Sequence, residues 1–135
     1  MEEALSKAQA LEKKYSWLEA KDVYEQALGK VDEKEFTKKG ELQERIGECL
    51  HRAAFQAESQ EEFNASMGGA VEAYGKARDL YAKLVDHEGS GRVLRCEATA
   101  KLLSHWITPE ASGKLRLLNE CVELEKQALA AFWDS

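Results

Sequence analysis

The chain has 135 residues and a formal net charge of -6, from 19 basic and 25 acidic residues. This length suits a single domain, and an excess of acidic residues disfavours contact with the phosphate backbone of nucleic acids. No apolar run approaches the ~18 residues of a transmembrane helix, and the N-terminus lacks the basic start and apolar core of a signal peptide. We therefore expect a cytoplasmic protein that neither binds nucleic acid nor inserts into a membrane.

The N-terminal third of the chain predicts two helices joined by a short turn. Helical periodicity over residues 2–14 predicts the first. Ser16 and Glu19 have the spacing of a capping box, which predicts that a second helix begins at Trp17. Gly29 is a natural stop for it. So short a connection predicts an antiparallel pair.

A third helix is predicted over about 32–57, with Asp32 as its N-cap. Gly47 lies in the middle of this helix, where glycine costs ~1 kcal/mol relative to alanine. We interpret it as a point of close packing against another helix rather than as a hinge.

The next segment allows two interpretations. Ser59 and Glu62 form another capping-box pattern, but Gly68–Gly69 interrupts the apolar periodicity that follows. Two adjacent glycines cost ~2 kcal/mol in a helix. The segment is either one weakened helix over 60–84, or a short helix followed by another that begins near Gly68, and we favour the second.

The C-terminal third predicts two further helices. Residues 86–91 have the composition of a loop, and a fifth helix follows from about Arg92 to Ile107. Thr108–Pro109 then suits the N-cap and first position of a sixth helix, which runs to about Trp133. The sequence shows no β-strand pattern.

A pattern of small residues recurs in the second, fourth and sixth predicted helices. Each instance has a small residue, a second residue four positions later and a third, small residue three positions after that. All three lie on one helix face, where another helix can approach closely. The residues are Ala20, Tyr24, Ala27 and Leu28, then Ala70, Tyr74 and Ala77, then Cys121, Glu125, Ala128 and Leu129. The recurrence suggests three helical hairpins, over about 1–31, 32–85 and 91–133, which must stack to bury their apolar faces.

The first hairpin resembles a tetratricopeptide repeat. The family's small and aromatic positions are matched by Ala8, Ala20, Tyr24 and Ala27, with Trp17 just after the turn. The second hairpin keeps its own small and aromatic residues but has about eleven extra residues before them, a length more similar to the soluble NSF attachment protein family.

The resemblance implies a fold and a function. The fold would be all-α, a right-handed α-solenoid of about three antiparallel hairpins in a single domain over 1–135. The function would be non-catalytic binding of a partner protein or peptide on the concave face. The alternatives are a trafficking adaptor of the attachment-protein type and a small-molecule-sensing accessory domain.

By the same resemblance, the first helix of each hairpin lines the concave face. The first of these helices has no Asn of the kind that clamps a C-terminal carboxylate in this family. The candidate contacts are Gln9, Glu12, Arg45, Arg52, Arg95 and Lys101. The basic residues either form a strip for an acidic peptide or only solvate the helix surfaces.

The sequence offers no catalytic or cofactor site. Cys49 and His51 are two residues apart and point to different faces of a helix, so they predict no metal site. We expect Cys49, Cys96 and Cys121 to be reduced core residues. The expectation is a protein without enzymatic activity, bound metal or cofactor.

The sixth predicted helix is apolar on two sides, whereas the last helix of a stack should have a polar outer face. Leu129, Phe132 and Trp133 are therefore predicted to form an assembly face. It would pack against a second copy, a partner or a neighbouring domain. The alternative is that the fourth and fifth helices bury it.

Overall fold

The computed structural model of the chain describes residues 2–84, 87–107 and 111–133, without the side chains of residues 87, 111–116, 118 and 133. Within these ranges the fold is all-helical, as predicted, with no β-strand. The helices are α1 (Glu2–Lys13), α2 (Trp17–Leu28), α3 (Phe36–Ala54), α4 (Gln60–Tyr81), α5 (His87–Ser104), the 3-10 helix η1 (His105–Ile107) and α6 (Ala111–Trp133).

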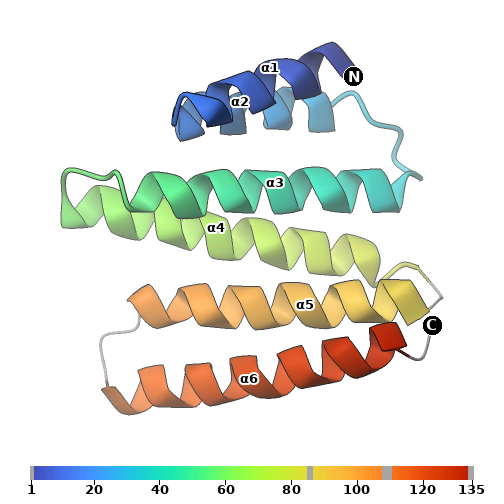
Figure 1. Cartoon of the computed structure of the whole chain (residues 1–135), viewed down its shortest axis with the longest axis vertical. Helices are drawn as coiled ribbons and strands as arrows, with labels where there is room; N and C mark the ends of the chain where they lie inside the picture. Colours follow the sequence, from blue (N-terminus) through green and yellow to red (C-terminus); the bar gives the residue numbers. More distant parts are fainter. Residues whose placement is uncertain (1, 85–86, 108–110, 134–135) are drawn as a thin grey trace.

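The helices lie side by side in chain order (Figure 1). The most extensive packing is within the pairs α3–α4 and α5–α6, while α1 packs on α2, α2 on α3 and α4 on α5 over smaller contacts. α1, α3 and α5 all end at the same end of the molecule, on the left in Figure 1, and α2 and α4 begin there. We call this the turn end.

Aromatic rings packed directly on glycine hold two of these pairs together. A Cβ atom placed on Gly40 of α3 would lie 2.5 Å from the Tyr81 ring of α4, and one on Gly47 would lie 2.7 Å from the Tyr74 ring. In the next pair, a Cβ atom on Gly91 of α5 would lie 2.8 Å from the Phe132 ring of α6. The interpretation of Gly47 as a point of close packing is therefore confirmed.

The glycine–aromatic contacts reveal an internal repeat. Gly91 lies 51 positions after Gly40, and Phe132 lies 51 positions after Tyr81. The second and third hairpins therefore place equivalent residues at equivalent contacts. The first hairpin is shorter, and its two helices have 12 residues each.

The small residues of the recurring pattern are buried, as their spacing predicts. They are Ala20, Ala27, Ala70, Ala77, Cys121 and Ala128. Tyr24 and Tyr74 are buried beside them, whereas Glu125, at the same position of the third hairpin, is exposed. These residues and the facing sides of α3 and α5 make up the core.

The double glycine does not break α4, so our favoured interpretation of that segment was wrong. α4 is continuous from Gln60 to Tyr81. Met67 and Ala70, on either side of Gly68–Gly69, are fully buried in one apolar cluster that includes Leu103. Burial of a methionine side chain contributes about 1.5–3 kcal/mol, which offsets the helix-propensity cost of the two glycines.

The loop predicted over 86–91 was also wrong, because α5 begins at His87. Gly89 and Gly91 are buried inside the helix, the latter beneath Phe132. Gly91, one of the glycines that suggested a loop, is therefore required by tertiary packing. α5 ends at Ser104, and the 3-10 helix η1 follows it to Ile107.

The predicted caps have mixed outcomes. Asp32 does not cap α3, which begins at Phe36, because its carboxylate accepts a hydrogen bond from the Lys34 amide within the connection. Ser16 precedes α2 but makes no side-chain cap bond. Ser59 does cap α4 by accepting from the Glu62 amide. The Thr108–Pro109 cap lies outside the described residues.

The packing role of Gly47 can be tested against a matched glycine. Gly68 has no atom within 4 Å of where its Cβ would lie, so Gly68→Ala should raise the free energy of unfolding by about 1 kcal/mol. Gly47→Ala should lower it by about 1–2 kcal/mol, because the clash with the buried Tyr74 ring exceeds the same propensity gain. Urea denaturation measures both, and equal stabilisation by the two substitutions would contradict the packing role.

Candidate functional site

Two hollows lie along the face formed by α1, α3 and α5. One, of about 160 Å³, is lined by Leu5 and Gln9 of α1 and by Arg45 of α3. The other, of about 490 Å³, lies between α3 and α5 and is lined by Arg45 and Arg95. The structure therefore brings the predicted contact residues Gln9, Arg45 and Arg95 onto one face.

A charge network crosses the second hollow. Arg95 Nη2 donates to both carboxylate oxygens of Glu44, at 2.8 and 3.0 Å. Arg92 pairs with Glu41 at 3.2 Å and with Glu88 at 2.8 Å. The Tyr81 hydroxyl donates to Glu44. This network ties α3, α4 and α5 together and pairs Arg95, one of the four residues of the predicted basic strip, with a carboxylate of the chain.

Other predicted contact residues are also paired within the chain. Glu12 accepts a hydrogen bond from the Tyr24 hydroxyl at 3.1 Å, inside the first hairpin. Lys101 of α5 pairs with Glu120 of α6 at 2.8 Å. Among the described residues, Arg45 is exposed and has no ion pair. Lys38 of α3, which lines the smaller hollow, is likewise exposed and without an ion pair among the described residues, so Arg45 and Lys38 are both cations on this face that a partner could contact.

Aromatic side chains form a continuous surface at the turn end. The Phe55 ring lies 5.3 Å from Trp106, 5.8 Å from Phe63 and 5.5 Å from His51, as centroid distances. Trp106 also contacts His105 at 5.5 Å. We call these rings, together with Tyr15 and Trp17 of the first hairpin, the aromatic ladder. Its members are Tyr15, Trp17, His51, Phe55, Phe63, His105 and Trp106.

Arg52, which follows His51 in α3, packs on a ring of the first hairpin. Its guanidinium lies 5.8 Å from the centroid of the Trp17 ring, and its Nε donates to Glu48 at 2.9 Å. Trp17 in turn lies 6.4 Å from the ring of Tyr15. The predicted contact residue Arg52 is therefore stacked on an aromatic ring, and the ladder spans all three hairpins.

Much of the ladder is open to solvent. Tyr15 is 69% exposed, Phe55 55% and Trp106 46%, and the exposed Leu18 and Ile107 lie at the same end. Scattered exposed apolar residues are ordinary, but a contiguous patch is typical of an interface, and Trp, Tyr and Arg are the residues that dominate binding energy there. This surface was missed from the sequence, although Trp106 follows Phe55 by the 51-residue period.

Tyr15 has a strained backbone. It has a φ of 62° and is the one residue besides glycine with positive φ among those that the structure describes. It ends α1 in a Schellman arrangement, in which the Ser16 amide donates to the Leu11 carbonyl and the Tyr15 amide to that of Glu12. Glycine is the usual residue there, and a larger side chain costs about 1–2 kcal/mol.

The three thiols of the chain are buried. Cys49, Cys96 and Cys121 are free and buried, as predicted. Burial raises the pKa of the Cys49 and Cys96 thiols to about 12, so both stay protonated near neutral pH. Burial lowers the pKa of His51.

Neither a metal site nor a membrane span is found in the described ranges. No three His, Cys, Asp or Glu side chains there are grouped so that they could hold an ion. No helix there is both long and apolar enough to cross a bilayer.

No protein-family model, curated protein or solved structure matches the chain. The resemblance to the tetratricopeptide repeat and to the attachment proteins therefore stays a prediction. It rests on the spacing of Ala8, Ala20, Tyr24 and Ala27 in the first hairpin.

The predicted assembly face on α6 is divided between two environments. Phe132 packs on Gly91 inside the third hairpin, whereas Leu129 is 60% exposed. Both border a groove of about 680 Å³ between α5 and α6. The side chain of Trp133 lies outside the described residues.

The backbone strain at Tyr15 predicts that the protein becomes more stable when glycine replaces this residue. Tyr15→Gly should raise the free energy of unfolding by about 1 kcal/mol, because glycine adopts positive φ without a steric cost. Lys14→Gly, one position earlier, should lower it by about 0.5–1 kcal/mol, since no such relief is available there. Thermal or urea denaturation would decide, and a loss of stability in Tyr15→Gly would refute the strain.

Proposed function

We propose that the chain is a non-catalytic protein–protein interaction module. It holds a partner protein or peptide on the face of α1, α3 and α5, with the aromatic ladder as the principal contact surface. The observation that carries this proposal is the ladder itself, whose rings come from all three hairpins, are in contact across the second and third, and are exposed at Tyr15, Phe55 and Trp106.

The strain at Tyr15 supports the same assignment. Its ring is 69% exposed and lies 6.4 Å from that of Trp17. Backbone strain at a residue that contributes little to the stability of the fold is typical of a functional surface. A partner that covers the ladder would gain the apolar area of this ring as well as those of Phe55 and Trp106.

The chemistry of the face indicates the kind of partner. Aromatic rings with mixed apolar and cationic neighbours suit a segment that presents aliphatic or aromatic side chains. Arg45 adds a site for a carboxylate on the same face, while Arg92 and Arg95 are already paired with carboxylates of the chain. The proposed ligand is therefore a peptide with apolar anchors and an acidic residue.

The architecture that we propose for this module is a short right-handed α-solenoid in the cytoplasm. It is supported by the packing of each hairpin on the next and by the 51-residue repeat of the glycine–aromatic contacts. Small-molecule sensing has less support, because the polar groups of the buried residues in the described core are only tyrosine hydroxyls and cysteine thiols, and the hollows open on the surface. The trafficking adaptor remains a variant of the same binding proposal.

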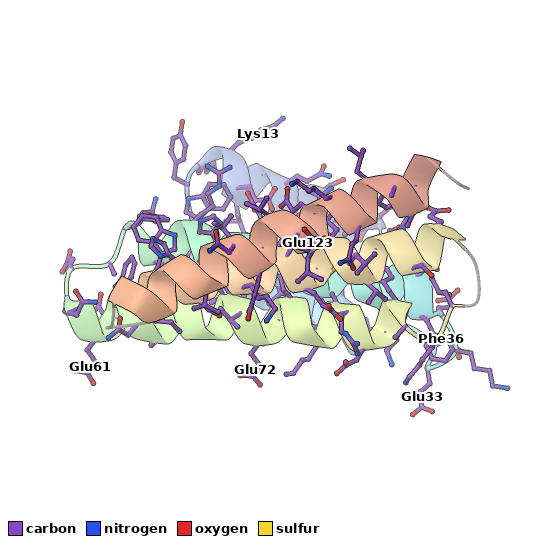
Figure 2. The ribbon with its side chains drawn as sticks, turned by 90° about the horizontal axis from the view of Figure 1, so that it is seen from below. Lys13, Glu33, Phe36, Glu61, Glu72 and Glu123 are labelled. Atoms are coloured by element: carbon purple, nitrogen blue, oxygen red, sulfur yellow. The ribbon has the colours of Figure 1, made fainter. Side chains whose placement is uncertain are left out.

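Peptide selection tests the proposal. Peptides selected from a random library on the intact chain should carry apolar anchors, and Phe55→Ala and Trp106→Ala should each weaken their binding about tenfold or more. Phe36→Ala is the matched control, because Phe36 lies at the end of the molecule opposite Glu61 and the turn end (Figure 2). Titration calorimetry measures the dissociation constants.

Two results would contradict the proposal. One is a selection that enriches no binding peptide. The other is a set of peptides whose affinity falls with Phe36→Ala and is unchanged by Phe55→Ala and Trp106→Ala. Circular dichroism of each variant distinguishes a lost contact from a lost fold.

A further inference from the structure

The outer face of α6 exposes large apolar side chains. Val122 is 54% exposed and Leu129 is 60% exposed, and their seven-residue separation puts them on one face of the helix. They border the groove of about 680 Å³ between α5 and α6, which Thr99 and Ala128 also line. Nothing else in the described chain covers this face.

The repeat shows that this face is unusual. The residues 51 positions before Val122 and Leu129 are Val71 and Arg78. Val71 packs against an apolar cluster shared with α5, and Arg78 pairs with Glu97 of α5 at 2.7 Å. In the second hairpin, α5 thus covers this face of α4. The equivalent face of α6 in the third hairpin is open, and Leu129 stands at the position equivalent to Arg78.

The residues on this face are arranged symmetrically about a single point. Val122 lies three positions before Glu125, and Leu129 lies three positions after Lys126. The sequence extends the symmetry with Leu118 four positions before Val122 and Trp133 four positions after Leu129. An apolar stripe with an acid and a base at its centre is complementary to itself when one copy runs antiparallel to the other.

We propose that α6 pairs antiparallel with α6 of a second copy about a two-fold axis between Glu125 and Lys126. In this register Val122 faces Leu129 of the partner subunit, and Glu125 faces Lys126 of the partner subunit. Apolar burial drives the association, and the two ion pairs select the antiparallel orientation. No residue of the aromatic ladder belongs to α6 or lines its groove, so this inference is independent of the partner-binding proposal.

Sedimentation velocity of the full chain over a concentration series tests the dimer. The wild type should show a reversible monomer–dimer equilibrium, and Leu129→Glu should raise its dissociation constant about 100-fold or more. Leu18→Glu is the matched control, because Leu18 of α2 is 53% exposed and lies outside α6. It should leave the dissociation constant unchanged.

Charge reversal tests the register. Glu125→Lys alone and Lys126→Glu alone should each weaken the dimer about tenfold, because each places like charges opposite one another twice. The double variant Glu125→Lys/Lys126→Glu restores both pairs and should return the dissociation constant to within about threefold of the wild type.

A wild-type chain that stays monomeric at every concentration would overturn the proposal. So would a dimer that survives Leu129→Glu, or one that the double charge reversal fails to restore, since either would place the contact elsewhere. A helix of an unrelated protein that binds at Leu129 while the chain alone stays monomeric would also overturn it.

Discussion

The contact between an aromatic ring and a glycine is the constraint on which the rest of the structure depends. Tyr74 lies on Gly47, and Phe132 lies on Gly91, at distances that leave no room for a Cβ atom. Such contacts bring the two helices of a pair close together and fix their register, because the ring meets the backbone at one position only. The 51-residue spacing of equivalent contacts shows that the second and third hairpins solve the same packing problem in the same way.

The surface features follow from this packing. When Tyr81 is fixed on Gly40, its hydroxyl reaches Glu44 and its ring lies beneath the Arg92 guanidinium, 5.1 Å from the ring centroid. In this network, many of the charged side chains on the α3–α5 face are paired with one another. Register also places the first residue after α3 beside the 3-10 helix that follows α5, so Phe55 meets Trp106 and apolar surface gathers at the turn end. In the binding mode that we propose, specificity for a partner depends on aromatic rings more than on a basic strip.

Local signals in the sequence predicted the helices, the hairpins and the buried small residues, because these depend on periodicity and on side-chain size. They failed where tertiary packing overrides local preference. Gly68–Gly69 and the glycines at the start of α5 discourage helix formation locally, yet burial of Met67 in α4 and packing of Phe132 on Gly91 in α5 favour the helical state. The pairing of Arg95 with Glu44 joins residues 51 positions apart, and no local pattern identifies it. The ladder was missed for the same reason, since its rings come from three separate turns.

The central claim is that the turn end binds the partner, and the three tryptophans of the chain provide the most direct test. Trp17 and Trp106 belong to the ladder, whereas Trp133 ends α6 at the opposite end of the molecule (Figure 1). The measurement is a nuclear magnetic resonance titration of the ¹⁵N-labelled chain with the tightest selected peptide, followed at the three indole N–H signals. The account predicts that the signals of Trp17 and Trp106 shift on binding while that of Trp133 stays in place. A shift of the Trp133 signal alone, or binding that moves none of the three, would contradict it.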